Sequence, residues 1–272
     1  MRRHKLWLLL MALVLVTTGC SRLTFIKPKM ERKDGEEIAP SYQVKDSPEV
    51  RQRMEAERAL ALATQRLQSD DLDGAERAVR AAQKAAPQSA DVQTLLAVLA
   101  DRHGQAKQAG EHYRRATELA PGRGAEQNNY GVWLCANGFP AEALVWFDRA
   151  LQDSDYETPA AALANAGGCA AQAGQHERAE RDLRQALTLD PGNVYALGAM
   201  AENEYRAGRY FEARAFVERR LAAASATADV LKLASQIEER LGDRTAAGRY
   251  VQQLRAEFPD ASDAQTGGKA EQ

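Results

Sequence analysis

The stretch that decides the fold is residues 124–150, which reads GAEQNNYGVWLCANGFPAEALVWFDRA. Two apolar-patterned segments flank Gly138, and each is long enough for about three helical turns. The first segment carries the small residue Gly131, and the second carries the small residue Ala143 and the large Phe147. The pattern predicts two antiparallel helices that approach closely at the small residues, with a turn at the central glycine.

This arrangement recurs along the chain in six blocks, 56–89, 90–123, 124–159, 160–193, 194–227 and 228–261. Position 20 of every block is alanine, namely Ala75, Ala109, Ala143, Ala179, Ala213 and Ala247. Position 8 is always small, position 24 is always large and apolar, and position 15 is glycine except for Asp70 in the first block. Two extra residues near Thr158-Pro159 lengthen the third block. Such a period predicts a repeat architecture.

These blocks resemble the tetratricopeptide repeat (TPR), a helix-turn-helix unit with small residues at positions 8, 20 and 27 and a large residue at position 24. Each helix pair is too small to bury its own apolar face, so neighbouring pairs must stack. We therefore expect an all-α fold, a TPR superhelix (α-solenoid) of six helix-turn-helix repeats over residues 56–261. Blocks five and six match least well, with Arg220 and Leu254 at position 27.

Residues 1–19 have the layout of an export signal: a basic start, an apolar run and small polar residues before Cys20. The ending Thr-Thr-Gly-Cys resembles the bacterial lipobox, which implies that Cys20 is lipidated. Ser21 after that cysteine implies, by the family's sorting rule, an outer-membrane protein facing the periplasm. The alternative is an ordinary secretory signal with Cys20 as a stray thiol.

The remaining segments outside the repeats are polar. Residues 20–55 carry mixed charges and three prolines, which predicts a lipidated cysteine followed by a flexible tether. Residues 262–272 form a polar tail. The short apolar patch 23–26 can be read either as part of this solvated linker or as an interfacial segment.

Charge and residue chemistry exclude several functional classes. The chain has 36 basic and 38 acidic side chains, so it has no positive excess with which to bind nucleic acid. His103, His112 and His176 are scattered over different blocks without the spacing of a metal site. We expect no enzyme activity, no metal, no cofactor and no small-molecule substrate. The alternative that we considered is an enzyme with Cys135 or Cys169 as its nucleophile.

The resemblance to TPR proteins also suggests where a partner would bind. In that family, positions 2, 5, 6, 9, 12 and 13 of the first helices face a groove. The groove residues expected here are Leu60, Leu67, Leu95, Val98, Asn128, Asn129, Val132, Asn165, Tyr195 and Tyr205. Aliphatic side chains next to amides suit an extended peptide or an amphipathic segment. The alternative is that the leucines pack against the tether or a neighbouring repeat.

Two cysteines lie in the middle repeats. Cys135 is at position 12 of block three and Cys169 at position 10 of block four, on adjacent first helices. Parallel neighbouring helices about 9 Å apart can bring such side chains within reach of each other. We expect a disulfide, which the export signal permits, with two buried thiols as the alternative.

The lipobox, the polar tether, six repeats, the segment NNYGVWLCANG and the two cysteines together resemble the type IV pilus biogenesis and stability lipoproteins, the PilF/PilW family. The family-like positions are Asn129, Tyr130, Leu134, Asn165 and the cysteine pair. The resemblance implies a pilotin: an outer-membrane lipoprotein that binds the pilus secretin subunit and promotes its localisation and multimer assembly. Pilus stability and twitching motility would then depend on it. The alternative is a TPR adaptor for outer-membrane barrel assembly or for recruiting cell-wall hydrolases.

Overall fold

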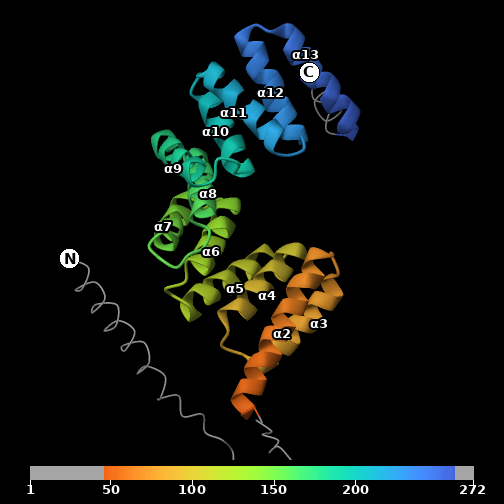
Figure 1. The fold of residues 1–272 in the computed structure, drawn as a ribbon, viewed down its shortest axis with the longest axis vertical. Coiled ribbons are helices and arrows are strands. Elements are labelled where there is room, and N and C mark those ends of the chain that lie inside the picture. The colour runs from red at the N-terminus through yellow and green to blue at the C-terminus, as the bar shows by residue number, and fades with distance from the viewer. Residues whose placement is uncertain (1–45, 261–272) are drawn as a thin grey trace, which may run out of the picture. The chain divides into compact units, whose positions relative to one another are not determined.

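The computed structural model describes residues 46–260, and all of their regular secondary structure is helical. The helices are α2 (Pro48–Gln68), α3 (Leu72–Ala85), α4 (Ala90–Arg102), α5 (Ala106–Leu119), α6 (Gly124–Ala136), α7 (Pro140–Ala150), α8 (Pro159–Gln172), α9 (His176–Leu189), α10 (Val194–Arg206), α11 (Tyr210–Ala223), α12 (Ala228–Leu241) and α13 (Arg244–Glu257). They follow one another as six pairs, from orange α2 to blue α13 in Figure 1. The predicted all-α TPR solenoid is confirmed.

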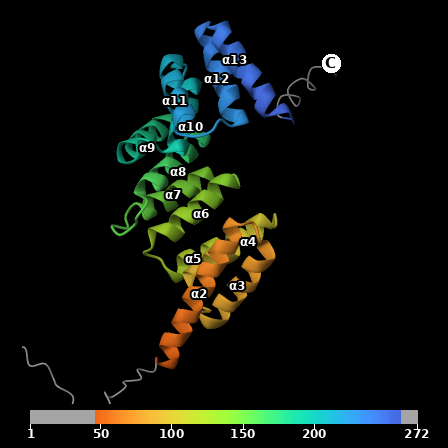
Figure 2. The same ribbon diagram turned by 45° about the vertical axis from the view of Figure 1, so that its right-hand side comes forward.

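Within each pair, two helices lie side by side, as α2 and α3 do in both views (Figures 1 and 2). The chain reverses at position 15 of each repeat, where the backbone has a positive φ, for example 88° at Gly138. Glycine suits this left-handed conformation because it has no Cβ. Asp70 takes the same conformation in the first pair, with φ at 58°.

The small and large residues of the repeat meet in the core. A Cβ built on Gly131 would lie 2.7 Å from the ring of Phe147, and one on Gly167 would lie 2.5 Å from the side chain of Leu183. Position 8 of the first helix is therefore small because the residue at position 24 of the second helix fills that space. Phe147 is fully buried, a burial that contributes about 1.5–3 kcal/mol.

Successive pairs are joined in two ways: the second helix of each pair packs against the first helix of the next pair, and the first helices of neighbouring pairs also touch. α2 contacts α4, α4 contacts α6, and the contacts continue through α8 and α10 to α12. Half-buried residues link neighbouring apolar clusters: Val98 packs against the clusters of the first and middle repeats, and Phe216 against the two C-terminal clusters. The core is thus built from contacts between nearest neighbours, as in other repeat proteins.

The first helix begins earlier than the sequence pattern predicted. Residues 48–55 were assigned to the flexible tether, but they form the first turns of α2. Pro48 is tolerated in the first turn of a helix, and Glu49 there is favourable beside the positive end of the helix dipole. These turns are mostly exposed, so they lack the apolar period that was used to place the boundary. Residues 1–45, with the expected signal and Cys20, and residues 261–272 lie outside the described part.

Candidate functional site

A groove of about 810 Å³ runs along the first helices of repeats four to six. Three helices, α8, α10 and α12, supply almost all of its walls, and α11 adds one side chain. The lining residues are Gly168, Ala171, Gln172, Val194, Tyr195, Gly198, Ala199, Glu202, Arg206, Arg220, Asp229, Val230, Lys232, Leu233 and Gln236. The volume lies within the roughly 300–1,000 Å³ that is typical of ligand sites.

Four of the residues that line the groove have little or no side chain. Gly168 and Ala171 come from α8, and Gly198 and Ala199 come from α10. A Cβ built on Gly198 would meet nothing within 4 Å, so the space above this residue is open. Gly168 is covered instead, because a Cβ there would lie 2.3 Å from the hydroxyl oxygen of Tyr195.

Apolar walls stand beside these four residues. Val230 and Leu233 of α12 lie on one side, and the half-exposed ring of Tyr195 lies on α10. Burial, and secondly the negative charge of Glu202, raise the pKa of the Tyr195 hydroxyl above its ordinary value. The hydroxyl therefore stays protonated at neutral pH, when it can both donate and accept a hydrogen bond.

The charged side chains of the groove are paired with one another. Arg206 forms an ion pair with Glu202, one turn away on α10, and Lys232 lies 3.9 Å from Asp229 on α12. Arg220 is buried and donates hydrogen bonds to the carbonyl oxygens of Ala224 (3.2 Å) and Ser225 (3.0 Å). Arg220 stands at position 27 of block five, one of the two blocks that match the repeat pattern least well. Its guanidinium binds the carbonyl groups that follow the end of α11.

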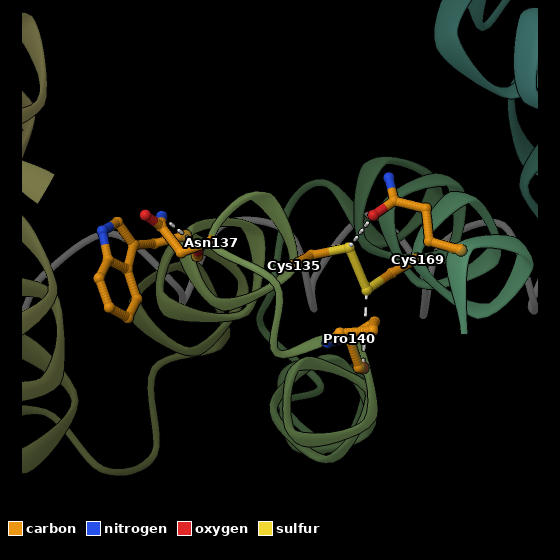
Figure 3. Close-up of a disulfide and its surroundings, with 6 residues drawn as sticks. Cys135, Asn137, Pro140 and Cys169 are labelled. Atoms are coloured by element: carbon orange, nitrogen blue, oxygen red, sulfur yellow. Dashed lines mark hydrogen bonds between the residues drawn. A yellow bond between two sulfur atoms is a disulfide. The ribbon is translucent and has the colours of Figure 1, made fainter.

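The disulfide lies next to the groove. Cys135 on α6 and Cys169 on α8 are bonded, with their Cα atoms 5.9 Å apart (Figure 3). The sulfur of Cys135 lies 3.6 Å from Oε1 of Gln172, a residue of the groove, and that of Cys169 lies 3.6 Å from the carbonyl oxygen of Pro140. Disulfide sulfurs carry no hydrogen, so these are contacts without a donated proton. The bond ties repeat three to the α8 wall.

Of the ten predicted groove residues, Tyr195 lines this groove. Leu60 and Leu95 are half-buried and pack against the apolar cluster of the first two repeats, and Val98 packs there too. Tyr205 stacks at a tilt on Tyr210, with ring centroids 5.5 Å apart, and it also packs against the C-terminal apolar cluster. These leucines therefore contribute to the apolar packing of the first two repeats.

Two of the predicted residues need correction. Leu67 and Asn128 are buried, with 8% and 9% of their surfaces exposed. Asn128 accepts a hydrogen bond of 3.0 Å from the side-chain amide of Asn165, so these two amides bind each other. The physical reason differs for the two: Leu67 on α2 packs in the apolar cluster of the first two repeats, and Asn128 on α6 is covered where α6 meets α8. Asn129 remains half-buried, and Val132 is 41% exposed.

Most of the groove was missed in the sequence although its positions obey the family rule. Gly168, Gly198 and Lys232 stand at positions 9, 5 and 5 of their blocks, and Ala171 and Ala199 at positions 12 and 6. The signal was therefore present. Glycine and alanine offer no side chain that binds a partner, and the open space beside them depends on how three helices pack, so the sequence alone did not single them out.

A second hollow of about 450 Å³ lies among α5, α6, α7 and the loops beside them. Trp146 is in its wall, and the guanidinium of Arg149 lies 4.5 Å from the centre of that ring. Its other lining residues are largely polar or come from loops. It is off the face formed by the first helices, so the larger groove is the better candidate for a protein segment.

The three histidines of the described residues do not form a cluster. Each has its own neighbour: His103 is 3.0 Å from Glu76, His112 is 2.8 Å from Gln93, and His176 is 3.2 Å from Asn203. Residues 46–260 contain no group of three His, Cys, Asp or Glu side chains arranged to hold a metal ion. Within the same range, no helix is long and apolar enough to cross a membrane.

Comparison with known proteins shows which families and structures this chain is similar to. The tetratricopeptide repeat family matches residues 170–237. The type IV pilus assembly protein PilF of Pseudomonas aeruginosa is 27% identical over 193 residues, which are 71% of this chain and 77% of PilF. The crystal structure of PilW, a widely conserved type IV pilus biogenesis factor, matches with a TM-score of 0.72 and 29% identity over 78% of this chain and 98% of PilW.

The solved structure of Pseudomonas aeruginosa PilF has the same fold, with a TM-score of 0.70 and 24% identity over 80% of this chain and 99% of that one. The sequence match to PilF covers 71% of this chain, and the structural match to PilW covers 78% of it. The chain is therefore a tetratricopeptide-repeat protein homologous to the type IV pilus assembly protein PilF and similar in structure to the pilus biogenesis factor PilW.

Proposed function

We propose that this protein is an outer-membrane pilotin of type IV pilus biogenesis. It binds the pilus secretin subunit, promotes the arrival of that subunit at the outer membrane and its assembly into multimers, and thereby supports pilus stability and twitching motility. Homology to a pilus assembly protein carries this proposal. The open groove, made of paired charges, small residues and apolar walls, is suited to holding a polypeptide, so the protein acts by binding and not by catalysis.

The proposed anchor is a lipidated Cys20 with the protein facing the periplasm. In the sequence, 27 residues lie between Cys20 and Pro48, the first residue of α2. Several acyl chains give membrane attachment that is effectively permanent, since each buried CH₂ contributes about 0.8 kcal/mol. The helical repeats could thus reach a partner beside the membrane while staying attached.

Deletion of the gene tests the function. We expect heat-stable secretin multimers, detected by immunoblotting of outer-membrane fractions, to be lost, and twitching motility to fail. A plasmid copy should restore both, whereas a Cys20→Ala copy should leave the protein unanchored and restore multimers poorly. Normal multimers and motility in the deletion strain, together with envelope defects, would instead favour an adaptor for another envelope machine.

A further inference from the structure

Two repeats hold an arginine over an aromatic ring in the same place. Arg149 in repeat three and Arg219 in repeat five both stand at position 26 of their blocks. Their guanidinium groups lie over the ring at position 23, with Arg149 at 4.5 Å from the centre of the Trp146 ring and Arg219 at 5.5 Å from that of Phe216. Because the two sites match, a difference between them points to a feature of one repeat alone.

The two arginines differ in their hydrogen bonds. Arg219 donates one to the carbonyl oxygen of Pro191, at position 32 of the preceding block, over 3.1 Å. The corresponding carbonyl before repeat three is that of Pro121, and the side-chain amide of Gln127 donates to it at 2.5 Å. Arg149 has no hydrogen-bond or ion-pair partner among residues 46–260, so its N–H groups are available to a ligand.

Gln127 and Arg149 both line the hollow of about 450 Å³ among α5, α6 and α7. Gln127 is 6% exposed, and its Oε1 has no hydrogen-bond partner among the described residues. A buried acceptor without a partner costs free energy, and a donor that enters the hollow removes that cost. The hollow therefore offers one unpaired acceptor and one cation with unpaired N–H groups.

We propose that this hollow binds the carboxyl end of a peptide, with the terminal carboxylate on Arg149 and a backbone N–H of the same end on Gln127. A guanidinium matches a carboxylate through two parallel hydrogen bonds. An N-acylated amino acid carries the carboxylate and the N–H next to each other, as the two unpaired groups of the hollow require. This site is separate from the groove along α8, α10 and α12, and the proposed function does not depend on it.

The charges on the walls favour a carboxylate over a phosphate. Glu118, which pairs with Arg115 at 2.9 Å, and Asp153, which accepts the N–H of Gly124 at 2.7 Å, both line the hollow. Two carboxylates repel an incoming anion in proportion to its charge. A peptide carboxylate carries one negative charge, whereas a phosphate group carries about 1.5 to 2 at neutral pH. The carboxylate therefore enters at the lower electrostatic cost.

A matched pair of arginine variants tests the site. Arg149→Gln removes the unpaired guanidinium, and Arg219→Gln makes the same change at the same position of repeat five, outside the hollow. N-acetyl-alanyl-alanine is titrated into the full-length protein in mild detergent, and binding is followed by saturation-transfer NMR. We expect Arg149→Gln to weaken binding by about tenfold or more, as the loss of charge-assisted hydrogen bonds does, and Arg219→Gln to leave it unchanged. Equal binding by the two variants would overturn the proposal.

Changes to the probe test the two recognised groups separately. The C-terminal amide of the same peptide lacks the charge, and an ester analogue lacks the last N–H. We expect each to bind the parent about threefold or more weakly than the acid. An amide or an ester that binds as tightly as the acid contradicts the assignment of that group. Inorganic phosphate that binds more tightly than the acid would show a phosphate site and overturn the proposed ligand.

A third variant copies repeat five. Position 4 is Gln127 in repeat three and Leu197 in repeat five, so Gln127→Leu frees the Pro121 carbonyl for Arg149. We expect peptide binding to fall by about tenfold, while the Tm stays at or above that of the parent because an unpaired buried acceptor is removed. Unchanged binding in this folded variant, or no binding of the peptide by the parent, means that the hollow is not the site.

A longer peptide with the same two final residues identifies the source of the ligand. Equal affinity for the long and the short peptide supports a site for free short peptides. A higher affinity for the long peptide, which is lost in Arg149→Gln, supports a site for the end of a protein chain. A long peptide whose binding is unaffected by Arg149→Gln binds elsewhere and counts against the proposal.

Discussion

Glu126 lies almost wholly buried in the first turn of α6, with 2% of its surface exposed. Its Oε1 is 3.2 Å from Arg123, which also binds Asp91 at 2.8 Å, and its Oε2 has no hydrogen-bond partner among the described residues. Burial raises the pKa of Glu126, the charge of Asp91 adds to this, and Arg123 opposes it. The folded state therefore prefers the protonated form more than the unfolded chain does.

This carboxyl should make the folded state less stable as the pH rises. The pKa of Glu126 in the folded state is above the unfolded value near 4.5. At pH values between these two pKa values, the folded protein binds more protons than the unfolded chain, so its free energy of unfolding falls as the pH rises through that range. Glu126→Gln has no carboxyl to ionise at this buried position, so it does not lose stability in this way. We expect its free energy of unfolding, relative to the parent, to improve as the pH is raised from about 4 to 7.

Urea unfolding at several pH values measures this difference. The exposed Glu142→Gln on α7 is the matched control, since it makes the same substitution at a carboxyl that is not buried. A pH-independent difference for Glu126→Gln would mean that the buried carboxyl has the same pKa in the folded and unfolded states.

The residue at the N-cap position of helix α6 does not cap the helix with its side chain. The side chain of Arg123 does not cap it, whereas Ser89 and Asn193 cap α4 and α10. Instead, Gly124 donates its backbone N–H to Asp153 at 2.7 Å, from the lengthened loop between α7 and α8. Tyr156 of the same loop packs against Gly124. The insertion in repeat three thus supplies a remote cap.

Removing that carboxylate should destabilise the helix. Asp153→Ala leaves the Gly124 N–H without its acceptor, and we expect a fall in Tm on the order of 2–4 °C. Asp155→Ala is the control, because the exposed Asp155 contributes its backbone N–H and not its side chain to this turn. Equal Tm values for the two variants in a thermal scan would count against the remote cap.

At position 11 the C-terminal repeats use buried ion pairs where repeats two to four have apolar residues. Position 11 is Leu134 in repeat three, but the fully buried Glu204 in repeat five and Glu238 in repeat six. Glu204 pairs with Arg209, and Glu238 with Arg214. Buried charges need such partners because an unpaired carboxylate is costly to desolvate. These elements therefore pack by charge pairing as well as by the small and large residues of the repeat.

At the scale of the whole solenoid, stability is a sum of contacts between neighbouring repeats. One covalent bond crosses such an interface, between Cys135 on α6 and Cys169 on α8. It closes a segment with a sequence separation of 34. A cross-link of that length restricts the unfolded chain and stabilises the folded one by about 2–4 kcal/mol.

Reduction should therefore weaken the protein. We expect a reductant to raise the intact mass by about 2 Da, the mass of the two hydrogens gained by the sulfurs. The free energy of unfolding should fall by about 2–4 kcal/mol. A variant with both Cys135→Ala and Cys169→Ala should respond to neither test. No mass change in the parent would show that the two cysteines are thiols in solution.

The sequence alone determined the helical repeats. Residues such as Gly131, Ala143 and Phe147 recur with a fixed period because every helix pair meets its partner in the same way, and Gly138 recurs at a turn that needs a positive φ. These requirements arise within each helix pair, so they can be recognised in the amino-acid sequence. The first turns of α2 were not predicted, because they are mostly exposed and therefore carry no apolar period.

Only the tertiary structure decided which first-helix residues are exposed and where the groove opens. Asn128 and Leu67 follow the family's groove positions but are covered by neighbouring helices, and the cap of α6 comes from Asp153, 29 residues away. The groove depends on the space above Gly198, which is empty because of how α8, α10 and α12 pack. Burial, remote contacts and empty space are properties of several segments together, so no single stretch of sequence contains them.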